Sequence, residues 1–195
     1  MEKLVIIING NGGVGKDTLC ESASLKYDIE SVSAITPIKE AAFKCGWNGE
    51  KTPAARKFLA VIKQACIEYN DYPLTYLTNC YNRFLKDSKQ ILFVHIREPE
   101  EITKFKKTVN IPCKTLLIRR SSLNQQWGNE SDDNVENYSY DYIFNNDLDL
   151  MYSKSSFIRF LGEIWDDVFF RGKHNNVEIS TTVKFQMPIF LGGAN

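Results

Sequence analysis

The sequence predicts an α/β fold in which helices cover both faces of a parallel β-sheet. Short aliphatic runs without polar alternation, typical of strands buried on both faces, alternate with longer stretches of helical periodicity. Strands and helices in this order form parallel sheets with right-handed crossovers, and therefore three layers. The chain has 195 residues, 43% of them hydrophobic, which is enough for one substantial core and does not require two. We therefore treat residues 1–195 as a single domain.

The first three predicted elements surround a glycine-rich segment. The continuous aliphatic run Leu4 to Ile8 is typical of a strand in the middle of a parallel sheet. Apolar positions at helical spacing predict a helix from Lys16 to about Tyr27, and Glu30 to Ile35 predicts a second short strand. The hydrophobic pattern alone therefore gives the order strand, glycine loop, helix.

The next segment, residues 36–87, has little strand character. Its helical stretches are separated by Gly46, Gly49, Pro53 and Pro73. The expected helices are Ile38 to Cys45, Ala54 to Tyr69 and Tyr76 to Leu85. A helical block of this size between the second and third strands is expected to be an insertion that holds a substrate.

The second half returns to alternating strands and helices, with one polar interruption. Pro99 opens a helix whose first turn is acidic, as the helix dipole favours. Residues 121–140 are rich in Asn, Ser and Asp and predict a lid-like loop. The other expected elements are strands at Gln90 to Ile96, Cys113 to Ile118 and Tyr142 to Phe144, a closing helix at Leu148 to Trp165, and an edge strand within Val177 to Leu191.

The glycine-rich segment has the pattern of a phosphate-binding loop. Gly10, four further residues, Gly15 and Lys16 match G-x-x-x-x-G-K between a buried strand and a helix, which is the context that this motif requires. Backbone N–H groups of such a loop converge on a phosphate, the helix start adds its positive end, and Lys16 can bridge β- and γ-phosphates. The sequence thus predicts a three-layer P-loop NTPase fold with a parallel sheet, a helical substrate-binding insertion and a lid loop. The expected nucleotide-binding residues are Gly10, Asn11, Gly12, Gly13, Val14, Gly15, Lys16, Asp17 and Thr18.

One position departs from that motif. Asp17 stands where a Ser or Thr hydroxyl ordinarily coordinates Mg²⁺. A carboxylate is also a hard oxygen ligand, so Asp17 is a candidate Mg²⁺ ligand, directly or through a metal-bound water. Thr18 is the alternative ligand.

The loop residues Ile6 to Gly10 and Gly15 to Thr18 resemble the deoxynucleoside monophosphate kinases, a branch of the P-loop kinases that often has GKDT in its loop. The segment Ile96 to Glu101 is similar to that family's V-R-x-P-x-E pattern, and residues 132–146 are similar to its acidic loop, Asp, strand and Asn. The similarity spans about residues 4–150. It implies an adenylate-kinase-like fold, ATP with Mg²⁺ as the phosphoryl donor and a nucleoside monophosphate as the acceptor. It also implies that Asn145 and Asn146 lie in the turn beside the adenine, with Asn145 as the nucleotide-binding candidate. The alternative is that a pair of Asn residues simply makes a turn.

Two features differ from that family. The third strand ends on His95, where the family tends to have an acidic residue that supports the metal. The lid-like segment 121–140 contains no Lys or Arg, whereas related kinases commonly have arginines there. Arg119 and Arg120 would then have to supply the positive charge of the lid.

Arginines at strand ends are candidate catalytic residues together with Lys16, because phosphoryl transfer depends on positioning and on positive charge around the transferring group. Arg97, Arg119 and Arg120 each follow an aliphatic strand run. The carboxyl ends of parallel strands meet at the edge where ligands bind. The alternative for each arginine is a surface ion pair with an acidic neighbour.

The helical insertion contains candidates for holding the acceptor. Lys39, Arg56 and Lys63 are cationic, and Arg56 is preferred because a guanidinium can bind two phosphate oxygens at once. Asp71 is a candidate to bind a hydroxyl or base of the acceptor, although an Asp shortly before Pro73 is also ordinary turn chemistry.

Composition limits the partners that we expect. The 24 basic and 24 acidic residues cancel, so neither nucleic acid nor a membrane surface is an expected partner. The run Leu4 to Ile8 is too short for a signal-peptide core or a membrane span, which predicts a cytoplasmic protein. The five cysteines are widely separated and lack C-x-x-C spacing, so neither disulfides nor zinc are expected. A homo-oligomer is left open.

The expected function is transfer of the γ-phosphoryl group of ATP to a nucleoside or deoxynucleoside monophosphate, a small-molecule nucleotide substrate. Two alternatives remain, a kinase of another small phosphorylated metabolite and a nucleotide-binding module without catalysis. A switch GTPase is not expected, because neither N-K-x-D nor D-x-x-G follows the loop.

Overall fold

The computed structural model describes residues 1–121 and 134–171. Five strands of this part of the chain form one sheet in the order β2-β3-β1-β4-β5, and every neighbouring pair is parallel. The central position expected for the first aliphatic run is confirmed, as is the strand expected at 142–144, whereas the edge strand expected within 177–191 lies outside the described residues. The strands are β1 (Leu4–Asn9), β2 (Ile29–Ser33), β3 (Ile91–His95), β4 (Cys113–Arg119) and β5 (Tyr142–Asn145).

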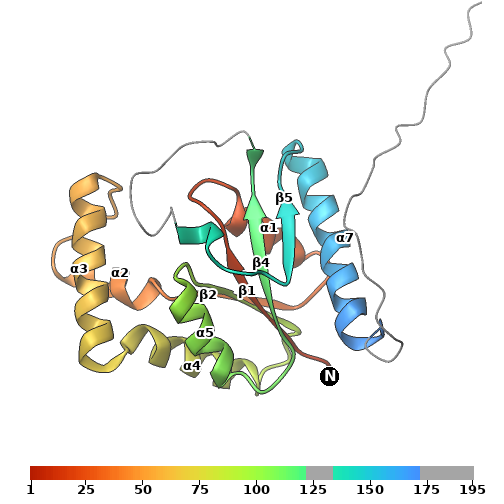
Figure 1. Ribbon diagram of the computed structural model, residues 1–195, viewed down its shortest axis with the longest axis horizontal. Coiled ribbons are helices and arrows are strands. Elements are labelled where there is room, and N and C mark those ends of the chain that lie inside the picture. The colour runs from red at the N-terminus through yellow and green to blue at the C-terminus, as the bar shows by residue number, and fades with distance from the viewer. Residues whose placement is uncertain (122–133, 172–195) are drawn as a thin grey trace, which may run out of the picture.

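Helices cover both faces of the sheet, which confirms the three predicted layers (Figure 1). On one face α1 (Lys16–Ala23) packs against α7 (Leu150–Phe169), and on the other lie α4 (Tyr72–Phe84) and α5 (Pro99–Thr108). None of the helices in the described part of the chain is both long and apolar enough to cross a membrane.

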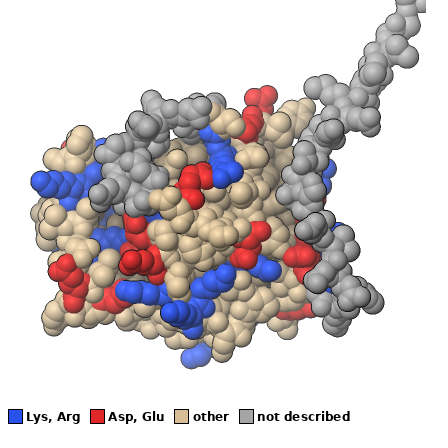
Figure 2. Space-filling view, viewed as in Figure 1, with Lys and Arg blue, Asp and Glu red and all other residues tan. Residues whose placement is uncertain are grey.

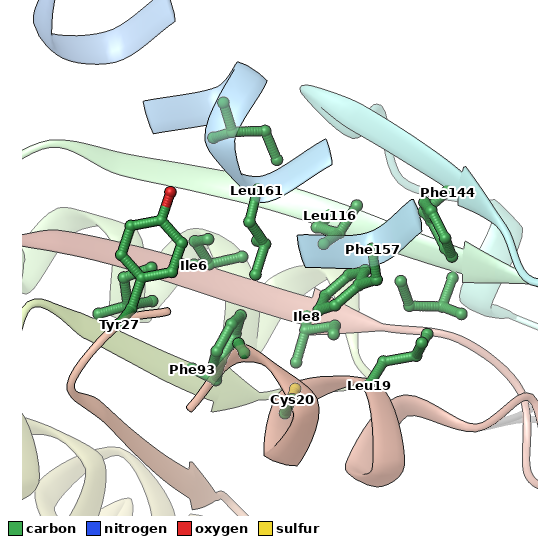
Figure 3. Packing of buried hydrophobic residues seen from close by; sticks show 14 of the residues in the cluster. Ile6, Ile8, Leu19, Cys20, Tyr27, Phe93, Leu116, Phe144, Phe157 and Leu161 are labelled. Atoms are coloured by element: carbon green, nitrogen blue, oxygen red, sulfur yellow. The ribbon is translucent and has the colours of Figure 1, made fainter. Parts of the chain in front are cut away.

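Strand β1 contributes side chains to both layers of the core. Ile6 and Ile8 pack toward α1 and α7, whereas Val5 and Ile7 pack toward α4 and α5, because successive strand residues point to opposite faces. Phe157 of α7 lies over Ile8 in the first of these cores (Figure 3). Each such side chain contributes roughly 1.5–3 kcal/mol by leaving water. Burial on both faces is the reason that this strand has no polar alternation.

The helices expected between the second and third strands are confirmed and begin directly after β2, whereas their substrate-holding role stays a prediction. They are α2 (Thr36–Lys44), α3 (Pro53–Asn70) and α4. Helix α3 starts where the Thr52 hydroxyl accepts a hydrogen bond from the backbone N–H of Ala55, and it ends at Asp71, whose φ of 49° is left-handed. Only Ala55 of its 18 residues is buried, and Figure 1 shows α3 at one side of the molecule.

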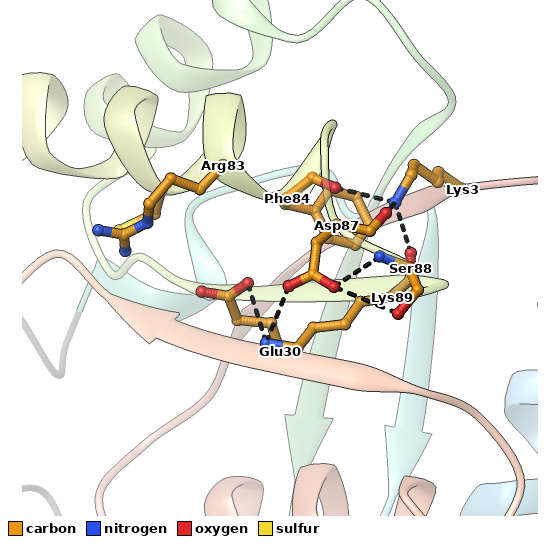
Figure 4. Close-up of polar contacts among 8 residues, drawn as sticks. Lys3, Glu30, Arg83, Phe84, Asp87, Ser88 and Lys89 are labelled. Atoms are coloured by element: carbon orange, nitrogen blue, oxygen red, sulfur yellow. Dashed lines mark hydrogen bonds and ion pairs between the residues drawn. The ribbon is translucent and has the colours of Figure 1, made fainter.

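The chain passes from α4 to β3 through a turn whose backbone carbonyls are hydrogen-bonded by Lys3. The Lys3 ammonium donates hydrogen bonds of 2.7–2.8 Å to the backbone carbonyls of Phe84, Asp87 and Lys89, and it lies 4.4 Å from the centre of the Phe84 ring (Figure 4). These bonds satisfy carbonyls past the end of α4 that would otherwise need water. The turn in this way fixes the start of β3 beside β1.

Several boundaries differ from the prediction, among them the start of α4, which is at Tyr72 and not at Tyr76. Helix α1 ends at Ala23 instead of continuing to Tyr27, because the chain closes a tighter turn there, in which Ser24 N–H donates to Glu21. Strand β2 ends at Ser33, since the chain turns into α2 within a few residues. Helix α7 extends to Phe169, whose side chain still packs against the core.

Candidate phosphate-binding site

Residues 10–15 join β1 to α1 and form a tight loop at the carboxyl edge of the sheet. Gly10 has a φ of 144°, and a Cβ on it would lie 2.4 Å from the carbonyl oxygen of Ile118 in β4. Gly15 has a φ of 91°, and a Cβ on it would lie 2.7 Å from Nδ2 of Asn146. Each position therefore requires glycine for two reasons, the backbone conformation and the close approach of a neighbouring segment.

Lys16 begins α1 and folds back over the loop. Its ammonium donates hydrogen bonds to the carbonyl oxygens of Gly10 and Asn11, the second at 2.9 Å. A phosphate held by the loop N–H groups and by the positive end of α1 would lie within reach of this ammonium. The loop and Lys16 together therefore have the features of a site for a polyphosphate.

A buried asparagine ties the start of the loop to two other segments. Asn9 is 1% exposed, and its Oδ1 accepts a hydrogen bond of 2.8 Å from the N–H of Gly10. Its Nδ2 donates to the carbonyl oxygen of Arg97 at 2.9 Å and to the hydroxyl of Tyr140 at 2.7 Å. The ends of β1 and β3 and the segment before β5 are thus joined at a single side chain.

A second buried asparagine holds the far end of the loop. Nδ2 of Asn146 donates to the carbonyl oxygen of Val14 at 2.7 Å, and its backbone N–H donates to that of Arg119 at 2.7 Å. The sequence singled out Asn145, whose side chain is exposed in the structure. A nucleotide role for Asn145 stays a prediction, whereas Asn146 is the residue that touches the loop.

His95 ends β3 and faces the start of α1. Its Nδ1 lies 3.8 Å from Oδ1 of Asp17, and its Nε2 lies 3.0 Å from the Ser31 hydroxyl. Burial lowers the pKa of His95 to about 4, although the nearby Asp17 acts to raise it, and Lys16 lowers it further. The imidazole is therefore neutral near pH 7 and is a poor proton acceptor.

Asp17 fits the metal role expected for it. Its side chain is 89% exposed in the first turn of α1, where a carboxylate can meet a cation bound to phosphates. Thr18, the alternative ligand, is half-buried. No group of three or more His, Cys, Asp or Glu side chains that could hold a metal occurs among the described residues. Mg²⁺ needs no such group, because nucleotide phosphates and water supply most of its ligands.

The three arginines expected at strand ends lie on the edge of the sheet that carries the loop. Arg97 follows β3 and is exposed, as is Arg120 after β4. Arg119 is the last residue of β4, and its guanidinium forms a two-pronged ion pair with Glu136 of the 3₁₀ helix η2 (Asn134–Glu136). In this structure Arg119 therefore adopts the alternative ion pair, and its phosphate role stays a prediction.

The acceptor candidates separate into two groups. Arg56 and Lys63 are seven residues apart and share one face of α3, and Lys63 Nζ lies 2.6 Å from Glu101 Oε1 in the first turn of α5. That face of α3 is therefore directed toward the end of β3. Lys39 lies exposed on α2. In Figure 2 acidic and basic side chains alternate across the face that includes α5.

Asp71 acts as a tether in this structure. Its carboxylate accepts a hydrogen bond of 2.8 Å from Lys104 of α5. Its left-handed φ of 49° between α3 and α4 fits the turn role named as its alternative. Sequence reasoning missed Glu101, whose Oε2 is buried without a hydrogen-bond partner. The available signal was an acidic residue in the first turn after a strand end, which also fits a plain helix-dipole role.

No protein-family model matches the chain, and no curated protein matches its sequence. Among solved structures, the tunicamycin resistance protein of Deinococcus radiodurans has a TM-score of 0.53 at 10% identity, covering 83% of this chain and 96% of that one. A shikimate kinase from Bacteroides thetaiotaomicron (TM-score 0.47, 16% identity, 84% and 98% coverage) and the Mycobacterium tuberculosis APS kinase CysC (0.45, 12%, 83% and 98%) are more distant in TM-score. The sheet order, the helices on both faces and the glycine loop after β1 confirm the predicted three-layer α/β fold with a parallel sheet.

Proposed function

We propose that the protein transfers the γ-phosphoryl group of ATP to a nucleoside or deoxynucleoside monophosphate. The observation that carries this proposal is the pairing of two cationic sites at one edge of the sheet. One is the glycine loop with Lys16 over it. The other is the face of α3 with Arg56 and Lys63, directed toward the start of α5. Transfer between two phosphate-bearing substrates requires positive charge on both sides.

On the donor side, the loop N–H groups and the start of α1 bind the β-phosphate of ATP. Lys16 exchanges the carbonyl oxygens of Gly10 and Asn11 for phosphate oxygens, which costs little because the ammonium already lies over the loop. Mg²⁺ held by Asp17 or Thr18 supplies further neutralisation of the phosphate charge. Arg97 and Arg120, exposed at the same edge, add positive charge near the transferring group.

On the acceptor side, Arg56 and Lys63 bind the acceptor phosphate, and Lys63 leaves Glu101 to do so. Glu101 then presents two carboxylate oxygens, one of which already lacks a partner, to hydroxyl or N–H donors of the acceptor. Asp71 lies near this site, since it lines one small pocket together with Glu101 and Lys104. Lys39, exposed on α2, is a further cationic candidate for the acceptor phosphate. A phosphorylated molecule that also carries hydrogen-bond donors satisfies both demands, as a nucleoside monophosphate does.

His95 is not suited to serve as the general base that a hydroxyl acceptor would use. A hydroxyl acceptor benefits from a general base whose pKa lies near the working pH. The neutral imidazole of His95, with a pKa of about 4, is a poor base. A monophosphate is already ionised at pH 7 and needs none.

One observation favours a second candidate, a nucleotide-binding protein without kinase activity. Arg119 is held by Glu136, and the segment 121–140 contains no Lys or Arg to replace it. If Arg119 keeps this partner when ATP is bound, positive charge is missing where it develops during transfer.

The test is incubation with Mg²⁺ and ATP and a panel of ribo- and deoxyribonucleoside monophosphates, with ADP and the diphosphate product both measured. We expect product from at least one acceptor, loss of that product in Lys16→Ala, and retention in the matched surface variant Lys86→Ala. Arg56→Ala should raise KM for the acceptor by about tenfold or more while leaving KM for ATP nearly unchanged. Saturable ATP binding with no acceptor-dependent ADP would reject the nucleoside monophosphate kinase and leave a kinase of another phosphorylated metabolite or the binding protein.

A further inference from the structure

Helix α3 has an apolar stripe that faces solvent. Phe58, Val61, Ala65 and Tyr69, here called the α3 stripe, are all exposed, Val61 at 59% and Tyr69 at 87%. They lie about 120–160° around the helix from Lys63, at about 100° per residue. Because Lys63 is held by Glu101 on the side of the sheet, the stripe points away from the rest of the molecule. Exposed apolar side chains that form a continuous row commonly mark an interaction surface.

The surface beside the stripe is hollowed. An open groove of about 550 Å³ runs along α3 to the start of α4. Its lining is almost entirely apolar and consists of Val61, Ile62, Ala65, Cys66, Tyr69, Asn70 and Tyr72. Phe58 lies on the same helix outside this groove, toward the N-terminal end of α3. The helix thus carries an aromatic ring that is 37% exposed and, farther along, a groove with an apolar lining.

We propose that the α3 stripe is the contact between two copies of this chain, with the two α3 helices antiparallel about a two-fold axis near residue 63. The stripe is nearly symmetric about that point along the helix. Phe58 and Tyr69 lie at its two ends, and Val61 and Ala65 lie on either side of its centre. An antiparallel pairing places Phe58 of each copy against the groove beside Tyr69 of the other. A two-fold contact of this kind uses the same patch twice, so both hollows are filled.

The charges along one edge of the stripe fit this pairing. Lys57 lies near the N-terminal end of α3 and Glu68 near its C-terminal end, on the same side of the stripe. Rotation about the proposed axis brings each Lys57 opposite the Glu68 of the other copy. A parallel pairing would place these edges of the two copies on opposite sides of the contact, so the two charges would not meet. Glu68 also accepts a hydrogen bond of 2.7 Å from Gln64, which orients its carboxylate and leaves it able to accept another.

The size of the contact sets its strength. Helix α3 is about 27 Å long, so the pairing of one helix from each copy buries less than the ~1,200 Å² of a standard stable interface. We therefore expect a dimer that dissociates on dilution, in the micromolar range. The opposite face of α3 stays directed toward α5, so this contact does not depend on the proposed kinase function.

Sedimentation velocity between about 1 and 200 µM tests the proposal. The sedimentation coefficient of the full chain should rise across this range, whereas Val61→Glu should stay monomeric throughout. Leu25→Glu is the matched control, because Leu25 is 79% exposed away from α3, and it should behave as the original chain. A monomer at every concentration, or an unchanged association of Val61→Glu, would overturn the proposal. Far-UV circular dichroism confirms that each variant is folded.

A charge exchange tests the antiparallel arrangement itself. Lys57→Glu and Glu68→Lys should each weaken association by about threefold to tenfold, because like charges then face each other. The double variant Lys57→Glu/Glu68→Lys should recover most of this loss. Additive weakening in the double variant would show that the two side chains do not meet, and the antiparallel contact would be rejected.

Discussion

The phosphate loop and helix α3 differ in how many buried contacts hold each of them in place. The loop is fixed from several sides by buried groups, with Asn9 and Asn146 bonded to backbone atoms and Gly10 pressed against β4. Helix α3 buries only Ala55 and reaches α5 through an ion pair. Regions with few buried contacts open at lower free energy than the core does. From this comparison we expect the proposed polyphosphate site to be rigid and the proposed acceptor side to move, as substrate entry would require.

The largest expected effect comes from closing the space at the loop. Gly10→Ala puts a Cβ 2.4 Å from the Ile118 carbonyl oxygen at a φ of 144°, so both the loop and β4 must shift. We expect it to lower the free energy of unfolding by about 3 kcal/mol or more. Gly46→Ala is the matched change in the insertion, because Gly46 also has a positive φ of 93° but nothing lies within 4 Å of its Cβ position.

Urea unfolding followed by circular dichroism measures both glycine variants. Gly46→Ala should lower the free energy of unfolding by only about 1–2 kcal/mol, the cost of the left-handed backbone conformation for a residue with a Cβ. A difference of less than about 1 kcal/mol between the two variants would mean that the loop adjusts as easily as the insertion. The contrast between a rigid and a movable side would then be wrong.

Removal of the Asn9 side chain, which holds the start of the loop, should have the next largest effect on stability. Asn9→Ala leaves the Gly10 N–H and the Arg97 carbonyl without their buried partner, which costs about 2–3 kcal/mol of stability. Asn82→Ala, at an exposed position of α4, should change stability by less than about 0.5 kcal/mol. Urea unfolding followed by circular dichroism measures both variants. Equal unfolding midpoints for the two would contradict the role given to Asn9.

Much of the framework could be predicted from the sequence because its signals are local. The aliphatic run of β1, the glycine loop and the proline at the start of α5 each carry their own periodicity or backbone requirement. Each of these elements is present in the structure at nearly the expected residues. Two of the boundary errors, after Ala23 and after Ser33, fell where a turn and not a hydrophobic pattern ends the element.

The side-chain partners could not be predicted, because they depend on register and on contacts between distant segments. Arg119 pairs with Asn145 in the β4–β5 ladder, and this register turns Asn146 toward the loop and Asn145 toward solvent. Nothing in a pair of adjacent asparagines distinguishes them. The pairing of Arg119 with Glu136, and of Lys63 with Glu101, likewise arises only after folding has brought separate elements together.

A smaller effect is expected from the tether of α3. Lys63 and Glu101 are both less than 20% exposed, so their coupling should be about 1 kcal/mol, above the typical value for exposed pairs. A double-mutant cycle with Lys63→Met and Glu101→Gln measures it. Hydrogen exchange of α3 amides should quicken about fivefold in Lys63→Met, while β1 amides change less. Lys104→Met removes a more exposed pair and should have a smaller effect. Equal acceleration in α3 and β1 would show that the pair stabilises the whole domain instead.

The last test changes no residue and uses the free cysteines as probes of both regions. Cys66 is half-buried in α3, whereas Cys20 is buried in α1 beside the loop, and burial raises the pKa of the Cys113 thiol in β4 to about 12. Because the thiolate is the reactive form, iodoacetamide at pH 8 should modify Cys66 in dilute native protein and leave Cys20 and Cys113 unmodified. Urea below the unfolding midpoint should accelerate labelling of Cys66 first, since α3 opens locally, while Cys20 follows global unfolding. If mass spectrometry finds the same urea dependence for Cys66 and Cys20 from the outset, α3 and the loop unfold as one cooperative unit, and their difference in burial has no dynamic consequence.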